Sequence, residues 1–309
     1  MGRLLALVLT VLGGPAAEQP DGTLVLGVVG NERSASAVHG ERAMVADPRT
    51  GSTHTRTLAG GTLCHGPLMA AGDRVLYAGY RGRRAVAMTL PLTLAGRPSS
   101  LGDADSIAPS PNPGHVWLGR WRHGRERSRV ALREVAVDGG GVAARAGGVL
   151  PRWSHTGLAT PEGLGMARAI GRGAPLAADG ARMASCAGRC RGLALWTARG
   201  RTRIAAPPGV RPLGSEGAFS PDGRRLALAV TRAGRQRAAI VDLAAGRWTL
   251  VPGGPMRNYY GAVAWSPTGR WLYFAGPDRG LYAWQPGAAD AVRLPIDAHG
   301  TVLSIAVAG

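Results

Sequence analysis

Two cysteines separated by three residues are the side chains of this 309-residue chain best placed for specific chemistry. Cys186 and Cys190 flank Ala187-Gly188-Arg189, where two strands are expected to turn. A three-residue hairpin loop brings its flanking residues within disulfide distance, and an oxidising compartment favours the bond. Half of a zinc site and a redox pair are the alternatives, but the chain has no second cysteine pair and no Cys-x-x-Cys. We predict a structural disulfide and expect Cys64 to be a buried thiol.

The histidines show no metal-ligand spacing. They are His39, His54, His65, His115, His123, His155 and His299. None lies two to four residues from another histidine, and none belongs to a cluster of cysteines or carboxylates, whereas a zinc site needs three or four ligands on close elements. We predict no metal and no cofactor. Ligands that converge on a central channel from distant parts of the chain are the alternative.

No catalytic motif is present in the sequence. A Gly-x-Ser-x-Gly nucleophile elbow is missing. A phosphate-binding loop of the Gly-x-x-x-x-Gly-Lys type cannot exist because all 37 basic residues are arginine. Asp103 and Asp105 are close in sequence, but their position before a strand is typical of turn capping. We therefore expect that the protein is not an enzyme.

One aromatic segment is a candidate for binding. Arg257, Asn258, Tyr259 and Tyr260 lie in a loop that leads into a predicted inner strand. Exposed tyrosines beside an arginine would suit contact with a peptide or a glycan. The alternative is that one or both tyrosines pack between repeats.

The net charge of +18 has two interpretations. A basic surface could bind nucleic acid or an anionic polymer of the cell envelope. The arginines are spread along the whole chain, however, without a run of five or six. We therefore favour the interpretation that the arginines occupy ordinary solvent-exposed positions and form no dedicated binding surface. We expect no specific nucleic-acid binding.

The first 17 residues have the layout of a secretory signal peptide. Arg3 supplies a positive start, Leu4–Leu12 is apolar, and Gly13–Ala17 contains small residues suited to cleavage. The apolar stretch is shorter than the ~20 residues that span a bilayer. We expect residues 1–17 to be removed, leaving 18–309 as one domain without a transmembrane span, secreted or in the cell envelope. A buried first strand is the alternative.

The remaining chain repeats with a period near 43 residues. The segments 218–227 and 264–273 align, and a weaker copy covers 175–184. Each copy has an apolar run, a turn ending in glycine, and a second run of alternating apolar residues. Four short strands per repeat are typical of a β-propeller blade.

These copies resemble the repeats of the TolB-type, WD-repeat-like β-propeller family. The closest match is Trp265-Ser266-Pro267-Thr268-Gly269-Arg270-Trp271-Leu272. The Gly-His and Trp-Asp pairs of true WD repeats are absent, so the hydrogen-bonded tetrad of that subfamily is not implied. The resemblance implies an all-β propeller over residues 22–309, and it is specific over about 175–297.

The spacing of first strands predicts the number of blades. They are expected to start near residues 64, 106, 158, 175, 217, 262 and 302. Because 158 and 175 are too close for a full repeat, we predict seven blade positions with the fourth truncated to a hairpin, Gly157–Thr160 and Leu164–Ala167. A loop between blades is the alternative for this segment. Six blades is the alternative. Pairing of Thr23–Val28 with Val302–Val307 would close the ring.

The functional prediction follows from the repeat, the leader and the missing catalytic motifs. We expect a monomeric, exported, non-catalytic scaffold whose rim loops bind a protein or a cell-envelope glycan or anionic polymer. One alternative is an enzyme of the lactonase or lyase type with its active site in the central channel. The other is polyanion binding through the distributed arginines, with a steep salt dependence.

Overall fold

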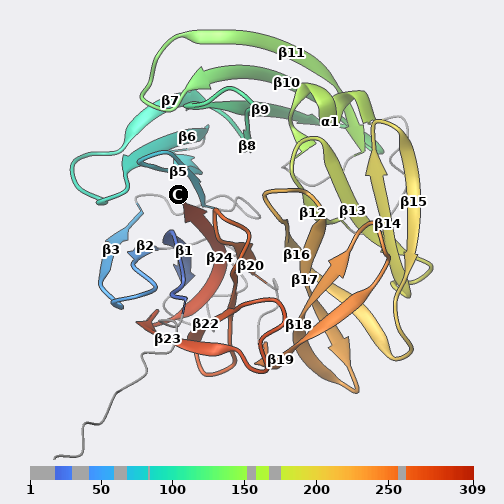
Figure 1. The fold of residues 1–309 in the computed structure, drawn as a ribbon. Helices are drawn as coiled ribbons and strands as arrows, with labels where there is room; N and C mark the ends of the chain where they lie inside the picture. The colour runs from blue at the N-terminus through green and yellow to red at the C-terminus, as the bar shows by residue number, and fades with distance from the viewer. Residues whose placement is uncertain are drawn as a thin grey trace, which may run out of the picture.

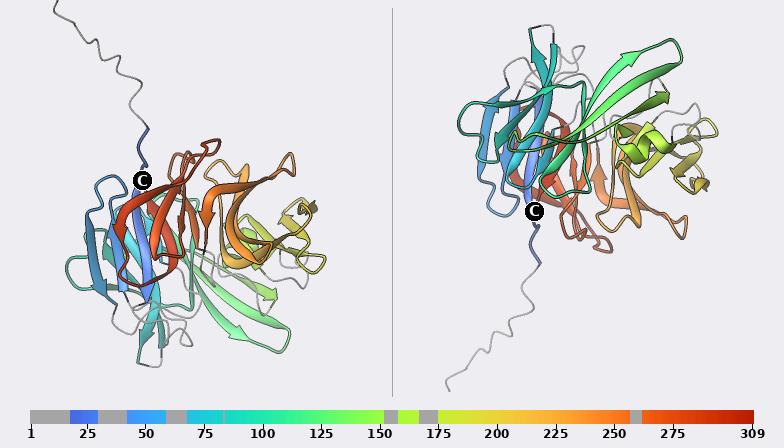
Figure 2. Two further views of the ribbon diagram at one scale, coloured as in Figure 1. Left: turned by 90° about the horizontal axis from the view of Figure 1, so that it is seen from below. Right: turned by 90° about the horizontal axis from the view of Figure 1, so that it is seen from above.

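The computed structural model describes residues 18–29, 42–58, 68–82, 84–151, 158–166, 175–256 and 262–309. In these residues the strands form six four-stranded antiparallel sheets, arranged as blades around a central axis (Figures 1 and 2). This confirms the all-β propeller. Each blade has strands A to D from the axis outward. We call the end of the ring with the A–B and C–D turns the A–B rim, and the opposite end the B–C rim.

The blades follow one another along the chain. Blade 1 contains β24 (Thr301–Ala308), β1 (Thr23–Val29), β2 (Arg42–Ala46) and β3 (Thr53–Thr57). Blade 2 contains β4 (Met69–Ala71), β5 (Arg74–Arg81), β6 (Arg84–Pro91) and β7 (Ser99–Asp103). Blade 3 contains β8 (Ser106–Pro109), β9 (His115–His123), β10 (Arg127–Ala136) and β11 (Val142–Pro151).

The second half of the ring has the same plan. Blade 4 contains β12 (Pro175–Ala178), β13 (Arg182–Ala187), β14 (Gly192–Thr197) and β15 (Gly200–Ala205). Blade 5 contains β16 (Val210–Phe219), β17 (Arg225–Arg232), β18 (Arg235–Asp242) and β19 (Trp248–Pro255). Blade 6 contains β20 (Val263–Trp265), β21 (Leu272–Ala275), β22 (Gly280–Trp284) and β23 (Val292–Asp297).

The repeated glycine is required by the backbone of the A–B turn. Gly223 and Gly269 have φ of 69° and 70°, the left-handed region that glycine enters at little cost. Each donates its N–H to the carbonyl of the serine three residues earlier, at 2.8 Å from Gly223 to Ser220 and 2.9 Å from Gly269 to Ser266. The sequence motif therefore repeats because the same turn geometry repeats in these two blades.

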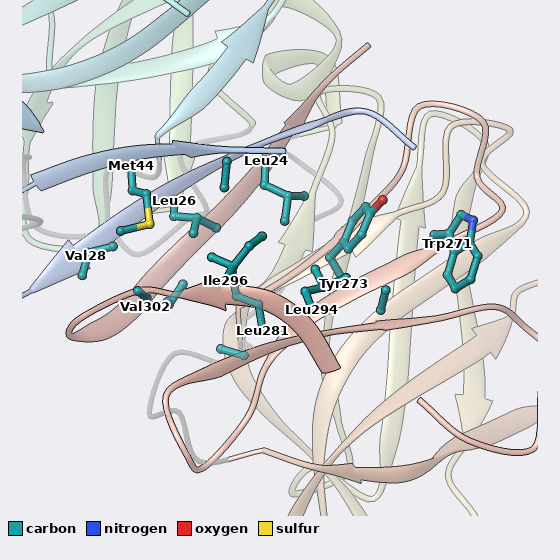
Figure 3. Packing of buried hydrophobic residues seen from close by; sticks show 14 residues of the cluster. Leu24, Leu26, Val28, Met44, Trp271, Tyr273, Leu281, Leu294, Ile296 and Val302 are labelled. Atoms are coloured by element: carbon teal, nitrogen blue, oxygen red, sulfur yellow. The ribbon is translucent and has the colours of Figure 1, made fainter. Parts of the chain in front are cut away.

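The two ends of the described chain close the ring as predicted. β24 pairs antiparallel with β1, from Thr23 opposite Ala308 to Val29 opposite Thr301, and the two strands lie side by side near the axis (Figure 1). Behind them, side chains from blades 1 and 6 form one buried cluster, in which Leu24 and Tyr273 are fully buried (Figure 3).

The core is divided in the same way all around the ring. Six buried clusters each combine side chains from two neighbouring blades. A blade therefore has little core of its own, and its apolar faces are covered only when both neighbours are in place. One ring of this kind is expected to unfold as a single unit.

The seven-position count is wrong, and the six-blade alternative is confirmed. The segment read as a stunted hairpin contains the short helix α1 (Pro161–Met166) instead. Thr160 begins it, since its side chain oxygen accepts the N–H of Gly163 at 3.0 Å, and proline suits the first helical position. Leu158 is fully buried in the cluster between blades 3 and 4, so the segment fills that layer without adding a blade.

No helix in the described part of the chain is long and apolar enough to cross a membrane.

Candidate binding surfaces

The centre of the ring holds a cavity of about 270 Å³ with an apolar lining. Its walls come from the inner strands of four blades and from the residue before β4, and include Leu68, Ala178, Phe219, Val263, Trp265 and Ile305. In the described ranges no group of three or more His, Cys, Asp or Glu side chains could hold a metal ion. The described residues that line this cavity include no acidic group.

A second cavity, of about 630 Å³, opens between blades 5 and 6 on the A–B rim. We call it the turn cleft. It is lined by the A–B and C–D turns of both blades, within residues 220–225, 240–249, 268–270 and 284–287. Its lining carries both signs of charge, namely the carboxylates of Asp222 and Asp242 and the guanidinium groups of Arg225, Arg247 and Arg270.

The two carboxylates of the turn cleft are fixed by their own turns. Asp222 accepts a hydrogen bond from Ser220 Oγ at 2.5 Å and one from the Arg224 N–H at 3.0 Å. These two bonds, that from the serine first, hold the pKa of Asp222 below its usual range. Asp242 accepts the N–H groups of Ala244 and Ala245, which lower its pKa likewise. Both stay ionised at neutral pH, which suits recognition better than proton transfer.

Glu18 connects the start of the described chain to the turn cleft. Its carboxylate is paired with Arg270 and also accepts a hydrogen bond from Gln285 Nε2 at 3.0 Å. Three residues later, the Asp21 carbonyl accepts the hydroxyl of Tyr273 at 2.6 Å. This segment therefore lies along blade 6 and neutralises one of the cleft arginines, while Arg225 and Arg247 face the two aspartates.

Arginines also connect neighbouring blades at the same rim. The guanidinium of Arg182 in blade 4 lies 4.7 Å from the ring centre of Phe219 in blade 5. Arg225 repeats this contact one blade on, 5.9 Å from the ring centre of Trp265. Each arginine stands two residues after the turn glycine of its own blade. The Gly-x-Arg spacing is therefore a signal in the sequence from which these contacts between blades could be predicted.

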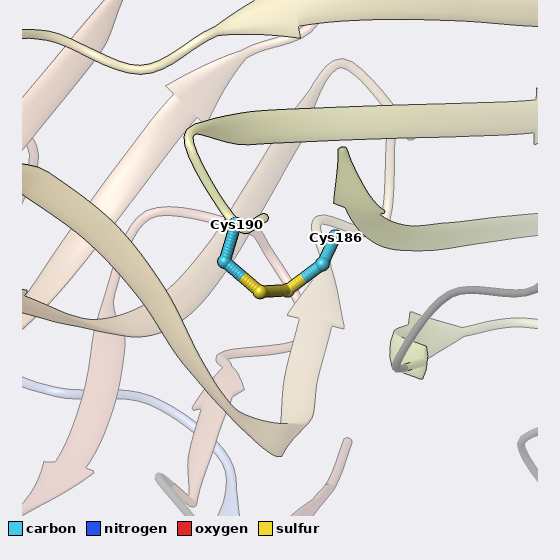
Figure 4. Close-up of a disulfide and its surroundings, with 2 residues drawn as sticks. All are labelled: Cys186 and Cys190. Atoms are coloured by element: carbon cyan, nitrogen blue, oxygen red, sulfur yellow. A yellow bond between two sulfur atoms is a disulfide. The ribbon is translucent and has the colours of Figure 1, made fainter. Parts of the chain in front are cut away.

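The predicted site residues have different outcomes. Arg257, Asn258, Tyr259 and Tyr260 lie outside the described residues, as do Cys64, three of the histidines and the expected leader. Cys186 and Cys190 form a disulfide, with 4.6 Å between their Cα atoms (Figure 4). It closes the turn between β13 and β14, where the Arg191 N–H donates to the Ala187 carbonyl at 2.9 Å.

Loss of this disulfide is expected to destabilise the protein modestly. The bridged turn holds two non-glycine residues, Arg189 and Cys190, in the left-handed region with φ of 57° and 59°, a conformation that costs free energy. A closed loop of about five residues predicts a loss of about 2 kcal/mol in the double variant Cys186→Ser/Cys190→Ser. Denaturant unfolding measures it. Wild-type protein in reductant should match the variant, and equal midpoints for oxidised and reduced protein would contradict the prediction.

Acid is expected to destabilise the A–B rim. Folding lowers the pKa values of Asp222 and Asp242. Their ionised forms therefore stabilise the folded state above the unfolded pKa near 4, and this stabilisation is lost as the pH falls through the folded-state values. The variant Asp222→Asn should lower Tm at neutral pH, and the difference from wild type should shrink below about pH 3. A difference that is constant with pH would show that the charge of Asp222 has no part in stability.

The chain is similar to known proteins in its fold and not in its sequence. No protein-family model matches the chain, and no curated protein matches it in sequence. Among solved structures it is similar to TolB from Acinetobacter baumannii, with a TM-score of 0.57 and 15% identity over 93% of this chain. The chain spans 66% of that TolB. It is also similar to a periplasmic gluconolactonase from Pseudomonas aeruginosa, with a TM-score of 0.51 and 15% identity over 93% of this chain and 99% of the other.

Proposed function

We propose that the protein is a non-catalytic, exported propeller scaffold that binds a protein or cell-envelope partner through its rim turns. The observation that carries the proposal is the turn cleft, a rim cavity of about 630 Å³ with charged groups of both signs. A cavity of this size is within the range of ligand sites. Alternating fixed charges select a polar partner by complementarity and give specificity as well as affinity.

Two further observations support binding over catalysis. The carboxylates of the cleft are held ionised by turn hydrogen bonds, whereas a general acid needs a raised pKa. The cavity at the axis is lined by apolar side chains. Export is supported by the disulfide and by the structural similarity to TolB and to a periplasmic enzyme.

Site-directed photo-crosslinking tests the proposal. A photo-reactive amino acid placed at Thr249, which is exposed in the cleft, should give a discrete crosslinked product in the envelope fraction of the producing cell. The matched control is Thr55, a threonine exposed on β3 of blade 1. The product should disappear when Arg225 and Arg247 are changed to glutamine. Equal labelling from Thr249 and Thr55 would contradict binding at the turn cleft.

A channel enzyme is the second candidate, favoured by the similarity over 99% of the length of the gluconolactonase. Purified protein should be assayed for gluconolactone hydrolysis, with and without added divalent cations. We expect rates equal to the uncatalysed background. Turnover that is saturable in lactone would overturn the non-catalytic proposal, whatever the crosslinking result.

A further inference from the structure

A cavity lined by three arginines lies on the B–C rim of blade 5, at the opposite end of the strands from the turn cleft. β17 runs from Arg225 in the turn cleft to Arg232 in this second cavity. The cavity has a volume of about 560 Å³. We call it the arginine pocket. It is lined by Arg232, Arg235 and Arg237 together with Ala233, Leu250, Val251 and Pro252.

The register of the hairpin places the three arginines on one face. Arg232 is directly opposite Arg235 across β17 and β18, and Arg237 follows Arg235 at the two-residue period of a strand. The turn between them has two residues, Ala233 and Gly234, with φ of 50° and 72°, so it holds the strands at hairpin distance. Like charges that face each other across a strand pair are destabilising. The facing arginines are therefore expected to lower the stability of the folded state.

An irregularity in β19 forms the other wall of the pocket. Arg237 pairs with Pro255, whereas Ala239, two residues on, pairs with Leu250. Residues 251–254 thus stand opposite Ala238 alone, so the pairing of β18 and β19 is interrupted there as in a bulge. Val251 is fully buried in the cluster between blades 5 and 6. That burial fixes the wall in place, while Leu250 and Pro252 remain half-buried beside the guanidinium groups.

The three guanidinium groups have no acidic partner among the described residues. Some arginines in the described part of the chain have such a partner, as Arg182 has Asp179 and Arg293 has Asp278. No ion pair or hydrogen bond within the described ranges involves the side chain of Arg232, Arg235 or Arg237. Three converging positive charges around a cavity, without a carboxylate to neutralise them, favour an anion as the missing partner.

We propose that the arginine pocket binds a phosphate group attached to an apolar moiety. A guanidinium presents a planar fork of donors that matches phosphate oxygens. Leu250 and Pro252, which are half-buried, would contact the apolar part of the ligand, and the volume suits a small molecule or one unit of a larger one. This site is separate from the turn cleft, so the proposal goes beyond the proposed function and does not depend on it.

Calorimetry with inorganic phosphate at fixed ionic strength tests the site. The variant Arg235→Gln/Arg237→Gln should bind at least about tenfold more weakly than wild type, since it removes two charged hydrogen-bond donors from the phosphate. The matched control is Arg81→Gln/Arg84→Gln, which removes the same charge from two arginines that face each other at the same turn of blade 2. It should bind as wild type does. Equal weakening in both variants, or no saturable binding to wild type, would overturn the proposal.

Thermal unfolding separates a binding defect from a folding defect. The variant Arg235→Gln/Arg237→Gln should melt at or above the wild-type temperature because the repulsion between Arg232 and Arg235 is relieved. A lower Tm would show that these arginines stabilise the fold by contacts within the chain, and would overturn the assignment to an external ligand.

Vesicles identify where the phosphate comes from. Vesicles of phosphatidylglycerol in phosphatidylcholine present it as a lipid headgroup. If Arg235→Gln/Arg237→Gln loses vesicle binding beyond the loss in Arg81→Gln/Arg84→Gln, the pocket takes a headgroup. If both variants lose vesicle binding equally while only the first loses inorganic phosphate, the pocket takes a free phosphorylated compound, and vesicle binding follows from net charge alone.

Discussion

Deletion of residues 301–309 is expected to abolish folding of the whole ring. β24 is the innermost strand of blade 1 and pairs with β1 along its length. Its side chains also pack into both adjoining layers, Ile305 and Val307 against blade 6 and Ala306 against blade 2. The deletion therefore opens the edge of β1 and uncovers apolar surface on both sides of the blade. Circular dichroism should show no cooperative thermal transition, and the expressed protein should be insoluble.

A circular permutant provides the control for this deletion. It begins at Thr301, joins Gly309 to Glu18 by a short Gly/Ser linker, and ends at Gly300. It keeps β24 and only moves the break in the chain to the connection between β23 and β24, and permutation at such surface connections is commonly tolerated. The permutant should fold cooperatively. A truncated protein that melts cooperatively near the wild-type temperature would show that ring closure is dispensable.

The repeat could be predicted from the sequence because its cause is local. The turn at Gly223 needs a residue that accepts a positive φ and a hydroxyl at Ser220 that accepts the Arg225 N–H at 2.9 Å. Both residues lie within the same short stretch of sequence. Ring closure was predictable for a related reason, since Thr23–Val29 and Thr301–Ala308 are each incomplete as blades. A strand with an unpaired edge must find a partner, and each chain end lacks what the other supplies.

The predicted number of blades was wrong because the spacing of apolar segments was given more weight than a local helix signal. An expected first strand near residue 158, only about 17 residues before the one near 175, was interpreted as a truncated blade. Thr160 followed by Pro161 is the start signal of a helix, and it decided the local structure. The cavities are a different case, because the turn cleft and the arginine pocket depend on which strands come together and on the bulge in β19. Sequence spacing alone does not contain that information.

Substitution of Arg182 by alanine is expected to cost about 2–3 kcal/mol of stability. Its guanidinium donates to the Gly223 carbonyl at 2.6 Å, pairs with Asp179 and stacks on Phe219. Only 26% of the side chain is exposed, so these interactions are partly protected from water. Two of the three contacts reach from blade 4 into blade 5. Denaturant unfolding of Arg182→Ala measures the loss.

Variants at equivalent positions show which of these contacts matters. Arg225→Ala removes the arginine at the same place in blade 5. The distance from its guanidinium to the ring centre of Trp265 is longer, at 5.9 Å, so this variant should cost no more than about 1 kcal/mol.

Arg182→Lys keeps the charge and loses the planar fork. A lysine ammonium can also donate to the Gly223 carbonyl, so if that hydrogen bond dominates, the lysine variant should lose less than Arg182→Ala. Gly223 fits this interpretation, since a Cβ there would lie 2.1 Å from the Arg182 guanidinium, so the turn glycine of one blade makes room for the arginine of the previous one. Equal losses in Arg182→Ala and Arg225→Ala would instead assign the stabilisation to stacking, which both positions share.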